Sequence, residues 1–403
     1  MSDWGGALDE AVDTRADELR AFRRHLHAHP EPSHEEYGTT ELLAARLREA
    51  GLAVRIPTSR RGLIAGPESD GTGIVAIRGD IDALRIHDLK DVGYRSTRDG
   101  VMHACGHDAH ATMVLGAAEA LWSCRNVLPE SVRWRAVFQP AEETGLGARE
   151  MIEAGAVEGV RAIVALHVDP ELETGCVAQR SGVMTAFCSD LRVVVKGVGG
   201  HAARPHQSTD PIAVAVQFVS TVYQFVPRSV DSREAAVITF GSIHGGGSAN
   251  AIPERVELAG TIRTLSWSAA VKVEERLRQI GAGLAEASGA EIEIRIERGV
   301  DAVVNDRAVN AACVLAASEV VGPGQVRPIA LPSMGGEDFA GYLAHTPGCL
   351  LRLGVASENR PRHFLHSPHF DIDERALTIG AKVLARSVVH LSLSHSSPGQ
   401  RRP

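Results

Sequence analysis

The densest group of reactive side chains lies at 102–110, where the sequence reads MHACGHDAH just before a stretch with helical periodicity. Cys105 and His107 stand two residues apart in it. A thiolate and an imidazole at this spacing can bind a divalent ion such as Zn²⁺, Mn²⁺, Co²⁺ or Ni²⁺, and Asp108 or His110 could orient them from behind. A helix cap needs only one polar side chain, so this crowding favours a metal site.

A second group is the adjacent pair Glu142 and Glu143, which follows an apolar stretch at 132–138 with the alternation of a strand. Two glutamates in a loop most often form a solvated turn. Their place after a core strand favours a site in which one carboxylate binds metal and the other accepts a proton from water. We expect the two neighbouring side chains to point in different directions.

Two single histidines complete a possible set of ligands. His167 follows the apolar run 163–166, and His366 lies in a Leu-His-Ser-Pro segment. A lone histidine is most often structural, and we keep that interpretation for His363, His369, His390 and His395. Catalysis by Cys105 as a covalent nucleophile, with His103 or His107 as its base, is a rival hypothesis. It leaves Glu143, His167 and His366 without a task.

Strands that alternate with helices must position these residues. The pattern predicts a helix at 109–122 and strands at 74–77, 132–138 and 162–166. Such alternation implies a largely parallel sheet, which binds ligands beyond the carboxyl ends of its strands. Asp80 and Asp82 follow the first of these strands, the glutamates follow the second, and His167 ends the third. We therefore expect all of them at one edge of the sheet.

Between residues 188 and 298 the pattern changes to β-α-β-β-α-β, an order typical of a ferredoxin-like module. The prediction is an α/β protein with a mixed, largely parallel sheet and helices on both faces, interrupted by an inserted α+β domain. The catalytic domain is then built from two parts, 1–187 and 299–403. Only the last stretch, 394–403, has the composition of a disordered tail.

Composition excludes several classes of function. The chain has 403 residues, a net charge of −8 and no basic cluster, which argues against binding to nucleic acid or anionic membranes and leaves a small-molecule substrate. We see no apolar run of the length that a bilayer requires. The acidic N-terminus lacks the pattern of a signal peptide, so we expect a cytoplasmic protein. Five single cysteines should be buried free thiols: Cys124, Cys176, Cys188, Cys313 and Cys349.

Together these segments resemble the metal-dependent amidohydrolases that include bacterial hippurate hydrolases, N-acyl-L-amino acid aminoacylases and plant auxin-conjugate hydrolases. The resemblance runs nearly from end to end. It is carried by the segments 24–31, 78–84, 102–108, 138–143, 165–167, 200–206, 250–253, 334–339 and 366–368.

The resemblance implies two divalent metal ions per chain, bound by Cys105, His107, Glu143, His167 and His366. It implies that Glu142 is the general base, which takes a proton from a metal-activated water and returns it to the leaving nitrogen. Cys105 stands where related peptidases have a bridging aspartate. Asp80 and Asp108 are expected to support the ligands from behind. The reaction implied is hydrolysis of the amide bond of an N-acyl amino acid.

The resemblance also implies that the inserted domain is a lid through which two chains form a homodimer. His201 is similar to the family histidine that polarises the scissile carbonyl, in the active site of the partner subunit. Asn250 and Arg263 are expected to receive a carboxylate of the substrate.

Two alternatives stay open. A dipeptidase or carboxypeptidase on the same fold would recognise a free α-amino group, and a metal-free binding or regulatory protein would keep the scaffold without the chemistry. Thr144 and Leu146 interrupt the glycine run that is usual after the paired glutamates, and Gly336 replaces a frequent serine. These departures leave the acyl group of the substrate open.

Overall fold

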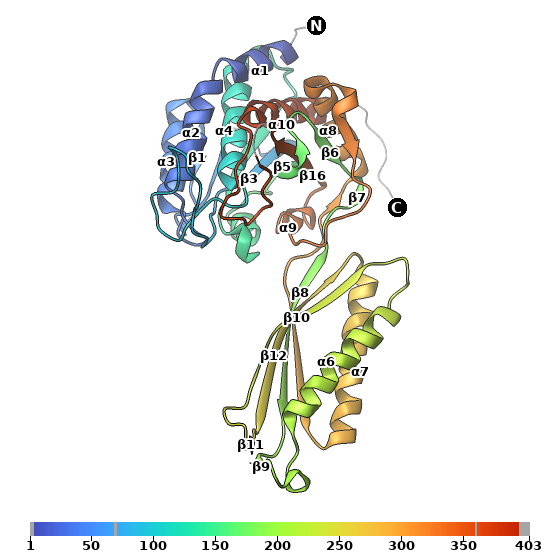
Figure 1. The fold of residues 1–403 in the computed structure, drawn as a ribbon. Helices are drawn as coiled ribbons and strands as arrows, with labels where there is room; N and C mark the ends of the chain where they lie inside the picture. Colours follow the sequence, from blue (N-terminus) through green and yellow to red (C-terminus); the bar gives the residue numbers. More distant parts are fainter. Residues whose placement is uncertain (1–3, 68–70, 359–360, 395–403) are drawn as a thin grey trace. The chain divides into compact units, whose positions relative to one another are not determined.

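The chain folds into two compact units (Figure 1). The computed structural model describes residues 4–67, 71–358 and 361–394, so most of the predicted tail, including His395, lies outside the described residues. The core unit consists of Met1–Met184, Val303–Leu331 and Asp338–Pro403, and the inserted unit consists of Thr185–Ala302 and Pro332–Glu337. The sequence had assigned 332–337 to the catalytic domain; in the structure this segment packs with the inserted unit.

An eight-stranded sheet forms the centre of the core unit, in the order β1-β2-β4-β3-β5-β16-β6-β15. The strands are β1 (Ala53–Arg55), β2 (Leu63–Gly66), β3 (Ile74–Asp80), β4 (Trp134–Gln139), β5 (Val160–Glu173), β6 (Val177–Gln179), β15 (Val326–Pro328) and β16 (Gly348–Ala356). The four central strands, β4, β3, β5 and β16, pair in parallel, whereas β1, β2 and the β16–β6 pair are antiparallel. The predicted mixed, largely parallel sheet is confirmed.

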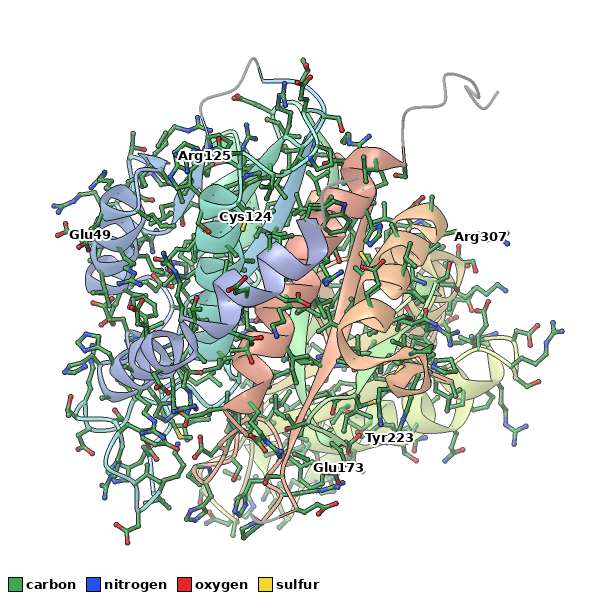
Figure 2. The ribbon with its side chains drawn as sticks, turned by 90° about the horizontal axis from the view of Figure 1, so that it is seen from above. Glu49, Cys124, Arg125, Glu173, Tyr223 and Arg307 are labelled. Atoms are coloured by element: carbon green, nitrogen blue, oxygen red, sulfur yellow. The ribbon has the colours of Figure 1, made fainter. Side chains whose placement is uncertain are left out.

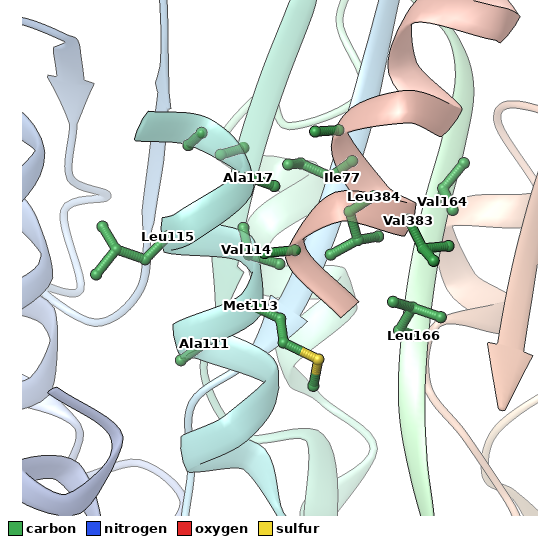
Figure 3. Packing of buried hydrophobic residues seen from close by; sticks show 14 of the residues in the cluster. Ile77, Ala111, Met113, Val114, Leu115, Ala117, Val164, Leu166, Val383 and Leu384 are labelled. Carbon is green, nitrogen blue, oxygen red and sulfur yellow. The ribbon is translucent and has the colours of Figure 1, made fainter. Parts of the chain in front are cut away.

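Helices cover both faces of this sheet. Successive residues of the central strands point to opposite sides, and apolar residues on both sides need to be covered. Val164 and Leu166 of β5 join one apolar cluster with helices such as α4 and α10, while Ile163 and Ala165 join another with α5 and α9. Figure 3 shows Met113 and Leu384 of the first cluster together with Val164 and Leu166. The helices are α1 (Trp4–Asp13), α2 (Ala16–Ala28), α3 (Tyr37–Glu49), α4 (His107–Ser123), α5 (Gly147–Glu153), α8 (Arg307–Val321), α9 (Ala340–Leu343) and α10 (Arg375–Leu393).

Two details of the core unit differ from the sequence prediction. β5 does not end at His167 but continues to Glu173, because β16 runs beside it as far as Ala356. Helix α10 contains an 18-residue window with a mean hydropathy of 1.3, which is long and apolar enough for a membrane span, contrary to expectation. Since 67% of that window is buried, its apolar character is that of a core helix.

The inserted unit has the ferredoxin-like order that the sequence predicts. Its elements are β8 (Phe187–Lys196), α6 (Pro211–Phe225), β10 (Ala236–Gly245), β12 (Arg255–Thr264), α7 (Trp267–Ser288) and β13 (Glu291–Arg298). The four strands pair antiparallel in the order β10-β12-β8-β13, and α6 and α7 pack on them through a separate apolar cluster. A small ribbon joins β9 (Gly200–His201) to β11 (Ala251–Ile252).

Short elements and cysteines complete the fold. The remaining elements are β7 (Gly182–Val183), β14 (Val304–Asn305) and the 3-10 turns η1 (Glu142–Thr144), η2 (Pro205–Gln207), η3 (Val226–Arg228) and η4 (Pro323–Gln325). All six cysteines are free, including the five predicted to be buried free thiols. Cys124 and Cys188 are only half-buried; Cys124 lies at the C-terminal end of α4, beside Arg125 (Figure 2).

Candidate metal centre

The turn that begins α4 brings Cys105 and His107 to the edge of the sheet. Gly106, between them, has a left-handed backbone (φ 86°), and a Cβ atom there would lie 2.4 Å from Cγ2 of Val168. Only glycine fits this position without strain. Cys105 Sγ lies 3.6 Å from Nε2 of His167 on β5. A thiol and two imidazoles from separate elements therefore gather at one point.

The hydrogen bonds of the two imidazoles leave their Nε2 atoms available. Nδ1 of His107 lies 2.9 Å from the carbonyl oxygen of Asp82, and Nδ1 of His167 lies 2.8 Å from the carbonyl oxygen of Val168. A carbonyl oxygen can only accept, so in each neutral ring the proton resides on Nδ1. The Nε2 lone pairs are then free to bind a metal.

The paired glutamates follow β4 in a tight turn. Ala141 is left-handed (φ 53°, ψ 38°) and is followed directly by η1. Oε2 of Glu142 and Oε1 of Glu143 lie 4.0 Å and 3.9 Å from Nε2 of His107. The two carboxylates thus do not diverge as expected, because the single 3-10 turn curls both toward the same imidazole.

His366 approaches this group from a loop before α10. Its backbone is left-handed (φ 65°), and its amide donates to the carbonyl oxygen of Ala104 over 2.8 Å. Nε2 of His366 lies 3.3 Å from Oε1 of Glu143. Its side chain is 51% exposed, whereas His167 and Cys105 are buried. The site is therefore closed on one side and open on the other.

The donor atoms fit two metal ions. Cys105, His107 and His167 form one group whose donor atoms all lie within 4.8 Å of one another, and Cys105, Glu143 and His366 form another. Among the described residues, Nε2 of His107 and Oε1 of Glu143 are buried without a hydrogen-bond partner. Buried polar atoms without partners are costly, and a bound cation would satisfy both. Sulfur, imidazole and carboxylate donors suit Zn²⁺ and similar ions.

Burial and neighbouring charges set the protonation of the site. Burial raises the pKa of the Cys105 thiol far above its ordinary value, so a thiolate there requires a nearby positive charge. Burial alone would lower the pKa of His107. Asp80, Cys105 and Asp82 together outweigh burial and raise that pKa well above the ordinary value, so a bound cation would displace a proton from this ring. Burial lowers the pKa of His167, and Arg352 adds to that effect. His167 is therefore neutral and ready to bind a cation.

Asp82, which the sequence analysis places at this edge of the sheet without a role, contacts two of the proposed ligands directly. Its Oδ1 lies 3.1 Å from Nδ1 of His107, and its Oδ2 accepts from the amide of Glu143 over 3.1 Å. Asp80, the predicted support, contacts Nδ1 of His110 and Nη1 of Arg78, each at 2.6 Å, and its Oδ1 lies 3.8 Å from Nε2 of His107. The sequence places both aspartates after the same strand, two residues apart. Because they would point to the same side, the strand pattern cannot tell which of them supports the proposed ligands.

Asp108 points away from the ligands. It is fully buried, and its Oδ2 lies 2.8 Å from Nε of Arg23 and 2.6 Å from Nδ1 of His27, both on α2. Burial would raise the pKa of Asp108, but the charge of Arg23 and the contact with His27 hold it well below its ordinary value. Asp108 therefore fixes α4 to α2 and acts on the site only through the backbone.

The remaining predicted site residues belong to the inserted unit. His201 and Asn250 lie together at the ribbon, where the amide of Ala202 donates to the carbonyl oxygen of Asn250 over 3.1 Å, and both are exposed. Arg263 lies near the C-terminal end of β12, whereas Asn250 precedes the start of that strand. Its guanidinium donates to the carbonyl oxygen of Met334 over 2.9 Å and to Sγ of Cys188 over 3.5 Å. The structure thus places Asn250 and Arg263 apart.

Comparison with known proteins identifies the family of the chain. Residues 76–390 match the model of "Peptidase family M20/M25/M40". The chain is 37% identical to N-acetylcysteine deacetylase of Bacillus subtilis, over 94% of this chain and 98% of that protein. It is 34% identical to thermostable carboxypeptidase 2 of Saccharolobus solfataricus, over 96% and 98%. A solved structure of the Bacillus subtilis YXEP protein, titled a dinuclear metal binding peptidase, has a TM-score of 0.79, 33% identity, and coverage of 94% and 98%. The chain is a hydrolase that belongs to peptidase family M20/M25/M40.

Proposed function

We propose that the protein is a two-metal amidohydrolase that cleaves the amide bond of N-acyl amino acids, with Glu142 as general base. The observation that carries the proposal is the meeting of five donors, of which Cys105 belongs to both ligand groups. Cys105 would therefore help to hold either ion, and its sulfur suits Zn²⁺ and similar ions. Zn²⁺, Mn²⁺, Co²⁺ and Ni²⁺ are the candidate ions.

The residues of the chain have separate tasks in this reaction. Bound ions would acidify a water and polarise the scissile carbonyl. Glu142 takes the proton of the attacking water and later delivers it to the leaving nitrogen. The amide of Asp338 donates to Oε1 of Glu142 over 3.4 Å and so orients the base. His201 donates to the developing oxyanion.

The relatives support the proposed substrate class. The likeness to N-acetylcysteine deacetylase supports an N-acyl amino acid, and the likeness to a carboxypeptidase favours peptides as the second candidate. A screen of N-acetyl, N-benzoyl and indole-acyl amino acids against dipeptides, with each candidate ion added in turn, separates them. Faster turnover of N-acyl amino acids is expected; turnover of dipeptides alone would contradict the proposal.

We also propose that a second copy of this chain covers an apolar groove on the inserted unit. The groove, of about 470 Å³, lies between α6 and β10 and is lined by residues that include Val216 (58% exposed), Tyr223 (48%) and Ile243 (52%). Tyr223 is labelled in Figure 2. β10 is an edge strand of its sheet, so one side of its backbone is available for pairing. A two-fold axis at such an edge would pair like with like.

Oligomeric state tests the groove. Val216→Asp should produce a monomer in light scattering, because it places a charge in the groove. Val271→Asp, on the exposed face of α7, is the matched control and should leave the dimer intact. A wild-type monomer, or a Val216→Asp dimer, would contradict this interface.

A further inference from the structure

Glu36 has a side chain that is turned away from its own helix. It is the N-cap residue of α3 and fully buried, yet its carboxylate makes no cap hydrogen bond to that helix. Glu31 takes this role instead, since Oε1 and Oε2 of Glu31 accept from the amides of Gly38 and Thr39 over 3.0 Å and 2.8 Å. The capping of α3 therefore does not require the Glu36 carboxylate.

The carboxylate of Glu36 holds two strained stretches of backbone. Its Oε1 accepts from the amide of Ala141 over 2.8 Å and from the amide of His34 over 3.0 Å. Ala141 (φ 53°) and His34 (φ 71°) are two of only four non-glycine residues with positive φ in the described part of the chain. Such backbone costs free energy and persists only where its surroundings enforce it. Glu36 supplies that enforcement for both residues.

Ala141 immediately precedes Glu142. A second contact joins the same segments, because Oγ1 of Thr144 lies 3.1 Å from Nε2 of His34 and donates to the carbonyl oxygen of Ala141 over 3.1 Å. At the other end of the turn, the amide of Glu143 is held by Asp82. Glu36 therefore holds Ala141, the residue before the base, whereas Asp82 holds Glu143, the proposed metal ligand.

We propose that Glu36 is a positioning residue for Glu142, which it orients through the left-handed turn at Ala141. The inference rests on the proposed role of Glu142 as general base. The Glu36 carboxylate accepts from backbone amides and not from the proposed metal ligands. It acts because general base catalysis falls steeply when the base moves by a fraction of an ångström.

Kinetics of Glu36→Ala test the inference. We expect kcat to fall about 10- to 100-fold, with KM changed less than about three-fold and with the same metal content, because Asp82 still holds Glu143. Glu36→Gln keeps an acceptor oxygen and should recover most of the activity. Glu31→Ala is the matched control: it removes the cap of α3, so the melting temperature should fall while kcat stays within about two-fold. Equal losses of kcat in Glu31→Ala and Glu36→Ala would mean that Glu36 has only a structural role.

A double-mutant cycle with Glu142→Gln separates the remaining outcomes. If Glu36 acts through the base, Glu36→Ala should cost almost nothing further when Glu142 is already Gln. Multiplicative losses would overturn the inference. If Glu142→Gln alone leaves kcat unchanged, the proposed base is wrong and the failure lies in the proposed function. Should Glu36→Ala not fold, Glu36→Asp can replace it in the cycle. The shorter side chain keeps the carboxylate but moves its oxygens away from the amides of His34 and Ala141, so the same outcomes are expected.

Discussion

The proposed catalytic residues of the two units are held in different ways. In the core unit, Cys105, His107 and His167 are buried, and the imidazoles are fixed through their Nδ1 atoms. In the inserted unit, His201 and Asn250 are exposed; His201 Nδ1 accepts from the amide of Ala203 over 3.0 Å, and Asn250 Oδ1 accepts from Ser248. The core unit thus presents a pre-organised set of buried donors, whereas these two residues of the inserted unit lie at an exposed ribbon.

The largest expected effect distinguishes the two adjacent glutamates of the core unit. Glu142→Gln should lower turnover on the order of 10²-fold or more with metal content unchanged, because it removes the base and keeps the shape. Glu143→Gln should lose metal. Activity assays with elemental analysis check both; a Glu142→Gln protein that lacks metal would reverse the two assignments.

The next effect probes the inserted unit. His201→Ala should lower kcat by about 10²-fold and leave KM and metal content nearly unchanged, because a contact made only in the transition state adds little to substrate binding. Steady-state kinetics check this prediction. Mixing this variant with Glu142→Gln chains should restore part of the activity if the histidine acts in the partner's site. Verified subunit exchange without recovery would show that it acts in its own chain.

A smaller effect is expected at the support of the ligands. Asp82→Asn should weaken metal binding about 10- to 100-fold, because it disturbs the partner of both His107 and Glu143. Asp80→Asn should weaken it less, since Asp80 directly contacts His110 and Arg78. Competition with a chromophoric chelator measures both affinities. A larger loss of metal affinity in Asp80→Asn than in Asp82→Asn would mean that Asp80 is the main support.

The smallest effect concerns pH and stability. Burial, with the charge of Asp82, raises the pKa of Glu36 from its ordinary value of 4.5 to about 7, although the amides it accepts from oppose this shift. An acid with a raised folded-state pKa contributes stability below its unfolded pKa and loses it as pH rises through the folded one. The melting temperature of chelator-treated wild type should therefore fall relative to Glu36→Gln by a few degrees between pH 4.5 and pH 8. A difference that does not change with pH would contradict this shift.

The sequence predicts the ligands better than it predicts their supports. Strand ends and a dense Cys-His motif locate Cys105, His107 and the glutamates, because the sheet brings such ends together. The contact between Glu36 and Ala141 spans 105 residues, and neither local periodicity nor motif spacing reports it. The direction of Asp108 likewise depends on Arg23 and His27, which reach it from another helix. These supports follow from tertiary packing, which single-sequence patterns do not encode.

Metal titration tests the central claim most directly. Chelator-treated protein should hydrolyse no N-acyl amino acid, and activity should return as one of the candidate divalent ions is added, with two ions bound per chain at saturation. Elemental analysis and activity measured on the same samples give both numbers. Full hydrolysis in the presence of chelator, or maximal activity without bound metal, would contradict a two-metal mechanism.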